Sequence, residues 1–278
     1  MVIESQEPDL PDRGSNAPAN GTDQRFVAYY AEESLSPRTL ERSAGIMRNV
    51  LRARTLRGLP TEGLAVADIA SNTGSQAFLW AEAGHRVRGI EISADLVGIA
   101  RRRASDRGLP VEFVEGTAAA LPWPTASMDV CLLAELLEHV PEWEVVLAEA
   151  CRVLRPGGAL YVSTTNWLCP RQSEFDLHFY SWYPAPLKRR CERLAVTTRP
   201  ELVNFARFPA VNWFSPYGLS RILRRQGFVS FDRFDLAEPE RLSAPARLAL
   251  SLIRAVPGGR LAGYMATPST SLVAVRKS

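Results

Sequence analysis

Residues 66–93 constrain the fold of this chain more than any other stretch. An apolar run leads through small residues to Gly74, an apolar helical segment follows at 78–83, and a second apolar run carries Glu91. A buried strand that runs through small residues into a helix leaves backbone N–H groups where a ligand can approach closely. A carboxylate roughly 20 residues after such a turn can accept hydrogen bonds from two ribose hydroxyls. The stretch therefore predicts a nucleoside-binding half-sheet.

The small residues of the turn indicate which nucleoside binds. Asp68 is followed by Ala70, Asn72 and Gly74, whereas a dinucleotide site requires G-x-G-x-x-G so that the backbone can approach a pyrophosphate. The segment D-I-A-S-N-T-G instead resembles the D-h-G-x-G-x-G signature of class I S-adenosylmethionine-dependent methyltransferases. The resemblance implies that the turn holds the methionine part of the cofactor and that Glu91, at the end of the second strand, holds the ribose.

Two positions of the turn depart from the family signature. Ala70 and Asn72 stand where the family usually has glycine, so the turn must accept a Cβ atom at one position and an amide side chain at the other. Asparagine tolerates a left-handed backbone better than most residues, which favours an intact turn. A changed cofactor pose, or an ordinary connection from strand to helix, are the alternatives.

A later segment resembles the family's passage over the adenine. It reads T-A-A-A-L-P at 117–122, after a predicted helix at 94–107 and a predicted strand at 111–116. The resemblance implies cofactor contacts from Ile92, Thr117 and Ala118. Because Thr117 replaces an acidic residue, its hydroxyl would accept from the exocyclic amine more weakly than a carboxylate does.

Glu135, Glu138 and His139 follow the predicted fourth strand. Positions i, i+3 and i+4 of a helical turn share one face, so the three side chains are expected to converge at the rim where α/β sheets bind ligands. The run resembles the E-x-x-E-H-V segment of ubiquinone-biosynthesis O-methyltransferases, which implies Mg²⁺ or a softer divalent ion at these residues. His139 as a metal-free general base and a segment that only caps a helix are the alternatives. Glu135 is also a predicted cofactor contact.

Strands and helices continue to alternate to the end of the chain. L-R-P-G-G at 154–158 is similar to the family's turn before the fifth strand at 159–166, and strands at 229–236 and 271–276 follow. We predict an α/β fold with a Rossmann-like, seven-stranded, mostly parallel sheet, helices on both faces and an insertion after strand five.

Composition divides the chain into three parts. Residues 1–22 are rich in Pro, Gly and polar residues and are expected to form a disordered tail. Residues 23–60 are predicted to form two capping helices, from which the resemblance implies that Tyr29 or Tyr30 closes over the cofactor; a core position is the alternative. Residues 61–278 are the predicted methyltransferase domain, with the insertion at 167–213.

The insertion is dense in aromatic residues. In the family a segment after strand five commonly walls the acceptor pocket, so its rings indicate an aromatic or otherwise apolar acceptor. His178 lies within it and is a second candidate for acid–base catalysis. The alternative is that these residues pack a small subdomain against the sheet.

Charge and hydropathy limit the kinds of partner that this chain is expected to bind. The 278 residues include 33 basic and 30 acidic side chains, for a net charge of +3, so nothing in the total requires nucleic acid. No apolar run approaches the ~20 residues of a membrane span, and a cytoplasmic location is expected. A basic amphipathic helix near 248–256 suggests peripheral membrane contact, although such helices more often pack on their own domain.

The sequence as a whole predicts an S-adenosylmethionine-dependent methyltransferase. We expect in-line transfer of the methyl group to an oxygen of an apolar or aromatic small molecule, with His139 or His178 accepting the departing proton. N- or C-methylation, a cofactor-binding relative that does not transfer methyl, and a non-enzymatic nucleotide-binding protein are the alternatives. The oligomeric state is left open.

Overall fold

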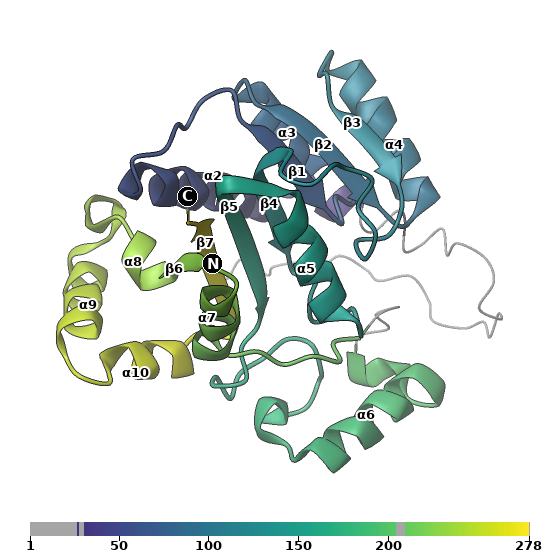
Figure 1. The fold of residues 1–278 in the computed structure, drawn as a ribbon. Coiled ribbons are helices and arrows are strands. Elements are labelled where there is room, and N and C mark those ends of the chain that lie inside the picture. The colour runs from purple at the N-terminus through teal and green to yellow at the C-terminus, as the bar shows by residue number, and fades with distance from the viewer. Residues whose placement is uncertain (1–26, 28–30, 204–208, 278) are drawn as a thin grey trace, which may run out of the picture.

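The computed structural model describes Val27 and residues 31–203 and 209–277, and at its centre is a twisted seven-stranded sheet (Figure 1). The strand order is β3-β2-β1-β4-β5-β7-β6. The strands are β1 (Ala65–Ile69), β2 (Arg86–Glu91), β3 (Glu112–Glu115), β4 (Met128–Ala134), β5 (Leu154–Thr165), β6 (Phe228–Asp232) and β7 (Ser269–Arg276).

The sheet is mostly parallel. β1 pairs in parallel with β2 and β4, β2 with β3, and β4 with β5, whereas β7 runs antiparallel to both β5 and β6. The chain builds outward from β1 to β3 and then returns to place β4 on the other side of β1. The carboxyl ends of β1 and β4 therefore flank the topological switch point, where open α/β sheets bind ligands. The predicted fold class is confirmed.

Helices cover both faces of the sheet. On β4, Val130 and Leu132 join the core under one set of helices, while Cys131 and Leu133 join the core under the other, as alternating side chains of a buried strand require. The first set is α2 (Pro37–Leu56), α3 (Ser75–Glu82) and α4 (Ala94–Asp106), and the second is α5 (Trp143–Val153) and α7 (Pro216–Arg225).

The second of the two predicted capping helices is α2. Its N-cap residue Ser36 accepts a hydrogen bond from the backbone N–H of Thr39 and so satisfies one of the free donors of the first turn. Residues 1–22 and most of the region expected to form the first capping helix lie outside the described residues, so those predictions stay predictions.

The sixth strand is shorter than expected. The sequence predicts a strand at 229–236, but β6 ends at Asp232 and α8 (Arg233–Leu236) follows. The Asp232 carboxylate accepts hydrogen bonds from the backbone N–H groups of Phe234 and Asp235, and the Asp235 side chain binds the Asp232 N–H in return. This capping box begins a helix where the apolar pattern alone favours a strand.

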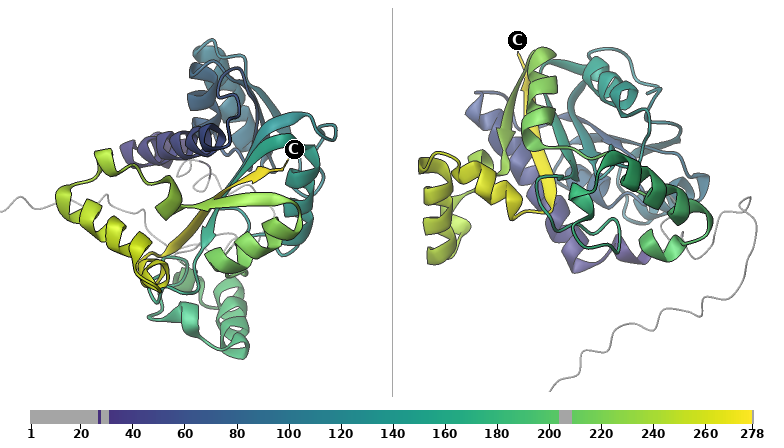
Figure 2. Two further views of the ribbon diagram at one scale, coloured as in Figure 1. Left: turned by 60° about the vertical axis from the view of Figure 1, so that its left-hand side comes forward. Right: turned by 90° about the horizontal axis from the view of Figure 1, so that it is seen from below.

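Two peripheral groups of helices stand off the sheet (Figures 1 and 2). Between β5 and α7 lie η1 (Tyr180–Trp182), α6 (Ala185–Thr197) and η2 (Pro200–Val203), and between α8 and β7 lie η3 (Pro239–Arg241), α9 (Ala244–Ala255) and α10 (Gly259–Met265). Each group has a small apolar cluster of its own. Of the helices described, none combines the length and the apolar character needed to cross a membrane.

Candidate cofactor and acceptor site

The turn after β1 has a left-handed backbone at each of its small positions. The φ angle is 60° at Ala70, 51° at Asn72 and 90° at Gly74. For a residue with a Cβ atom this conformation costs roughly 1–2 kcal/mol, so glycine is the usual occupant. The Asn72 side-chain oxygen accepts a hydrogen bond from the Thr73 N–H at 2.7 Å, which offsets part of that cost. The turn keeps a glycine-type backbone although two of its glycines are missing.

Gly74 cannot be replaced in the same way. A Cβ atom at this position would lie 2.7 Å from ring carbons of both Phe78 and Phe113. Phe78 belongs to α3 and Phe113 to β3, and the two rings contact each other edge to face beneath the turn. Gly74 therefore lets the start of α3 lie directly on this aromatic pair.

Glu91 is joined directly to the turn. It is only 8% exposed, and its two carboxylate oxygens accept hydrogen bonds from the backbone N–H groups of Asn72 (3.0 Å) and Ser93 (3.1 Å). A carboxylate oxygen has two lone-pair positions, so each oxygen retains one for a ribose hydroxyl. The next residue, Ile92, is 67% exposed and offers an apolar surface at the same edge of the sheet.

Asp68 lies buried in β1, beneath the turn. Burial raises the pKa of its carboxyl to about 7, and the nearby charge of Glu91 acts in the same direction. A cationic ligand group at the turn would favour the ionised form of Asp68. The site thus contains a carboxyl whose charge depends on pH near neutrality and on what is bound.

The predicted adenine segment follows β3. Ala118 is half-buried, whereas Thr117 is exposed and its hydroxyl accepts a hydrogen bond from the Ala119 N–H at 3.2 Å. The hydroxyl oxygen is therefore shared between the chain and any ligand amine, while its O–H remains a donor.

An N-terminal segment is anchored to the turn by Arg103 of α4. Its guanidinium donates hydrogen bonds to the hydroxyls of Ser34 and Thr73, each at 2.9 Å, and to the Ala31 carbonyl at 2.7 Å. Sequence reasoning missed this anchor, because its partners lie 30 to 72 positions away and no local pattern connects them. Tyr29 and Tyr30 precede the anchored segment but lie outside the described residues, so the predicted contact of either with the cofactor stays a prediction.

Glu135, Glu138 and His139 do not share the helical face that the sequence predicts. Glu135 has a left-handed backbone with φ 51°, and residues 137–139 form a turn rather than a helix. The i, i+3, i+4 relation of a helix therefore does not apply to these side chains. Across the described ranges, no group of three His, Cys, Asp or Glu side chains is placed to hold a metal ion, and the predicted metal ligands do not fit that role.

Glu138 has the most unusual environment of the three. It is fully buried, and its backbone carbonyl accepts hydrogen bonds from the N–H groups of Val211 and Asn212. Burial raises the pKa of the Glu138 carboxyl well above its usual range, and the charges of Glu135 and Glu174 act in the same direction. The neutral form of Glu138 is favoured, so its side chain can donate a hydrogen bond.

The two histidines predicted to act in catalysis differ in position. His139 is half-buried at the rim beside Glu138, and its backbone N–H donates to the Leu136 carbonyl at 3.0 Å. His178 is exposed in the segment that precedes η1. Near it, Phe175 and Tyr180 stack with ring centroids 4.0 Å apart in the small core of the insertion. The alternative of a packed subdomain thus accounts for part of the aromatic content.

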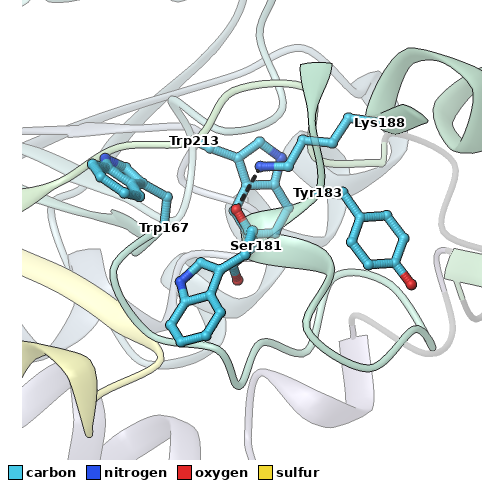
Figure 3. A pocket seen from close by; sticks show the side chains of 6 residues that line it. Trp167, Ser181, Tyr183, Lys188 and Trp213 are labelled. Carbon is cyan, nitrogen blue, oxygen red and sulfur yellow. Dashed lines mark hydrogen bonds between the residues drawn. The ribbon is translucent and has the colours of Figure 1, made fainter. Parts of the chain in front are cut away.

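Other rings of the insertion line an open pocket of about 590 Å³ (Figure 3). Inside it the Lys188 ammonium donates a hydrogen bond to the Ser181 carbonyl at 2.9 Å and lies 4.5 Å from the centre of the Trp213 ring. Burial lowers the pKa of Lys188, and the charge of Glu192 opposes this. The pocket is lined by Trp167, Ser181, Trp182, Tyr183, Lys188 and Trp213.

The pocket borders the rim of β4 and β5. Trp167 comes two residues after the end of β5, and the Asn212 side chain next to Trp213 donates hydrogen bonds to the carbonyls of Leu137 (2.9 Å) and Val140 (2.7 Å). Sequence reasoning did not identify Lys188, because a basic residue on an amphipathic helix usually indicates a solvated face.

The sequence matches a known domain family over the same region. Residues 67–162 match the family model described as a methyltransferase domain. A demethylmenaquinone methyltransferase of Thermus thermophilus is 38% identical over 99 residues, which cover 35% of this chain and 45% of that protein. A ubiquinone biosynthesis O-methyltransferase of Rhizobium rhizogenes is 36% identical over 107 residues, or 38% and 43% of the two chains. The chain thus matches less than half the length of these curated relatives.

Fold comparison agrees with the sequence match. A phosphoethanolamine N-methyltransferase 2 of Haemonchus contortus superposes with a TM-score of 0.58 at 15% identity, over 92% of this chain and 58% of that one. A protein of Pyrococcus horikoshii has a TM-score of 0.55 at 18% identity, over 92% and 100%. The chain therefore shares its fold with these solved structures, and its residues 67–162 match a methyltransferase domain. Its sequence is similar to those of the ubiquinone and menaquinone biosynthesis methyltransferases.

Proposed function

We propose that this protein transfers a methyl group from S-adenosylmethionine to an oxygen of an apolar or aromatic small molecule. The observation that supports this most directly is the Glu91 carboxylate, which is hydrogen-bonded to the turn after β1 at the switch point of the sheet. The same arrangement occurs within residues 67–162, the part that matches the methyltransferase domain.

The residues at the turn fit the cofactor. Glu91 would hold the ribose hydroxyls, Gly74 with Ala70 and Asn72 would line the methionine end, and Ile92 would pack on the adenine. Thr117 and Ala118 would border the adenine edge, while Asp68 and Glu135 would place negative charge near the cationic end of the ligand. When bound, the cofactor supplies an electrophilic methyl group on a sulfonium.

The aromatic pocket is the proposed acceptor site. Its walls include Trp167 and Trp213, and aromatic side chains bury flat apolar molecules with large contact areas. The Lys188 ammonium faces the same space and would favour an acceptor that carries a hydroxyl or an anionic oxygen. The chain orients this acceptor so that its oxygen approaches the methyl group in line.

His139 is the proposed general base. As the oxygen–carbon bond forms and the sulfur–carbon bond breaks, a ring nitrogen of neutral His139 takes the hydroxyl proton. Glu138 is fully buried and favours its neutral form, so it would not compete with His139 for the proton. Exposed His178 is the less favoured candidate for the base. We route no step through a metal ion, because the described residues do not gather ligands for one.

Transfer to carbon is the second candidate. Relatives with similar sequences include proteins named demethylmenaquinone methyltransferase and ubiquinone/menaquinone biosynthesis C-methyltransferase. A phenol deprotonated by the same base carries negative charge on its ring carbons as well as on oxygen, so the orientation of the ring in the pocket would decide the product.

The test is methyl transfer from methyl-labelled S-adenosylmethionine to a hydroquinone, a catechol and an aromatic amine, with product analysis by mass spectrometry. We expect an O-methylated product, a loss of about 100-fold or more in His139→Ala, and little change in His178→Ala. Label on carbon or nitrogen would overturn the oxygen assignment. Absence of transfer, with S-adenosylhomocysteine still bound, would instead indicate a relative that binds the cofactor without methylating.

A further inference from the structure

Helices α9 and α10 present large apolar side chains to solvent. Figure 2 shows both helices projecting from the body beyond β6 and β7. The exposed fractions of these side chains range from 43% for Leu261 to 63% for Leu248. The full set is Leu248 and Leu252 of α9, Val256 directly after α9, and Leu261 and Met265 of α10.

The exposed leucines face away from the protein. Leu250 is the buried residue of α9, and it packs with Phe234 of α8 and Tyr264 of α10. At 3.6 residues per turn, Leu248 and Leu252 each lie about half a turn from Leu250, on the opposite side of the helix. The fold therefore anchors α9 along a narrow line and leaves an apolar stripe that packing among the described residues does not explain.

The charged side chains on the two helices themselves are all basic. The sequence from 241 to 278 contains six basic residues and no Asp or Glu. Arg247 and Arg254 of α9 donate to backbone carbonyls, including those of Pro239 and Phe234, and neither forms an ion pair within the described part of the chain. Arg260 of α10, in contrast, pairs with acidic side chains next to α8. The apolar stripe is thus flanked by uncompensated positive charge.

We propose that the α9–α10 hairpin, residues 244–265, docks on an anionic lipid bilayer. An apolar stripe flanked by arginines is the pattern of helices that lie in the plane of a membrane interface, with leucines in the acyl boundary and guanidinium groups at the phosphates. A partner protein with an apolar groove would bury the leucines equally well, but the absence of acidic residues over this stretch favours a uniformly anionic surface.

The hairpin is joined to the wall of the aromatic pocket. The Asn166 side chain donates hydrogen bonds to the carbonyls of Tyr264 (2.9 Å) and Thr267 (2.7 Å), and Leu168 packs in the apolar cluster of the hairpin. Trp167, between these two residues, lines the pocket. Docking would therefore bring the pocket near the bilayer, from which an apolar acceptor could enter. This last step depends on the proposed function, whereas docking itself does not.

Co-sedimentation with vesicles tests the proposal in the absence of any methyl acceptor. The full chain is mixed at low salt with vesicles of phosphatidylcholine alone, or of phosphatidylcholine and phosphatidylglycerol in equal parts. The variant pair is Leu248→Asp with Leu252→Asp, and the matched control is Leu56→Asp at the end of α2, where the exposed fraction of 54% is close to the 53% of Leu252. All three positions are exposed, and thermal unfolding checks that each variant remains folded.

We expect binding to the anionic vesicles that weakens as salt is added, at least a tenfold loss in the α9 double variant, and wild-type binding in Leu56→Asp. Absence of binding to anionic vesicles, or equal binding by the α9 variant and the control, would overturn the proposal. So would sedimentation showing a dimer that the α9 variant dissociates while vesicles bind neither protein, because the stripe would then be an interface between two copies. Methyl transfer does not enter this measurement, so its outcome is separate from that of the proposed function.

Discussion

The carboxyl ends of β2 and β4 each carry a glutamate next to the proposed site, but the two side chains lie in different environments. Glu91, the last residue of β2, accepts backbone hydrogen bonds from Asn72 in the turn after β1 and from Ser93 in the loop after β2. Glu138, after β4, is fully buried, and burial with two neighbouring carboxylates raises its pKa well above the usual range. The first glutamate is arranged to bind hydroxyls as an acceptor, and the second is arranged to act as a neutral donor.

The difference shows how the two halves of the site are built. The turn that would bind the cofactor lies in one stretch of the chain, residues 65–93, in which strand, turn and helix follow one another. The acceptor half combines the segment after β4 with residues 167–213, which are far apart in the sequence. Substitutions that test the cofactor part therefore change its backbone geometry or its charge. Each is expected to leave the structure of the acceptor part unchanged.

The largest expected effect concerns the pH dependence contributed by Asp68. Its pKa is raised from 3.8 to about 7 in the folded chain, so the folded state holds a proton that the unfolded state releases. The contribution of this proton to the free energy of unfolding is fully present below about pH 4. It is lost as the pH rises to about 7, and above that pH there is no further change. Relative to Asp68→Asn, the wild type should lose up to about 4 kcal/mol over this interval. Urea unfolding of both proteins at several pH values measures this, and parallel curves would show that Asp68 is not perturbed.

Gly74→Ala should reduce the free energy of unfolding by about 3 kcal/mol, because it combines a left-handed backbone with a collision against two aromatic rings. Gly84→Ala is the matched control. Its φ of 85° is similar, but nothing lies within 4 Å of the added Cβ atom. The control should lose only about 1–2 kcal/mol in the same urea titration. Equal losses in the two variants would mean that the Phe78 and Phe113 rings move aside to accommodate the added methyl group.

Arg103→Ala should destabilise the protein by about 2 kcal/mol, since it removes charge-assisted hydrogen bonds to Ala31, Ser34 and Thr73. It should also weaken binding of S-adenosylhomocysteine, because Thr73 belongs to the turn. Arg102→Ala, an exposed neighbour on the same helix, should change stability by no more than about 0.5 kcal/mol. A loss in both variants would point to α4 as a whole rather than to the anchor.

The smallest expected effect is a gain from Ala70→Gly. Removing the Cβ atom relieves roughly 1–2 kcal/mol of left-handed strain, and the added freedom of the unfolded chain cancels about 0.5–1 kcal/mol of that. We expect a net stabilisation of up to about 1 kcal/mol in thermal or urea unfolding. A destabilised variant would mean that the Ala70 methyl group makes contacts that outweigh the strain.

The sheet and the cofactor turn could be predicted from sequence because their determinants are local. Alternating apolar segments separated by helices identify a parallel sheet, and Asp68, Gly74 and Glu91 lie at the spacing that a nucleoside-binding turn requires. The left-handed backbone at Asn72 also follows from its residue type.

Other features could not be predicted, because they depend on tertiary contacts. A single left-handed residue, Glu135, ends the strand so that its neighbours do not form the expected helical face. The Arg103 anchor and the Lys188 pocket join segments that are distant in the sequence. The end of β6 is set by a capping box formed by Asp232 and Asp235. In a strand pattern these two residues count only as ordinary polar positions.

Calorimetric titration with S-adenosylhomocysteine tests the central claim most directly, namely that Glu91 holds the cofactor ribose at this turn. Glu91→Ala should weaken binding by about 1.5–3 kcal/mol, roughly 10- to 150-fold. Glu115→Ala, which alters the exposed register partner of Glu91 on β3, should stay within about twofold of the wild type. Unchanged affinity in Glu91→Ala, or an equal loss in both variants, would contradict the assignment.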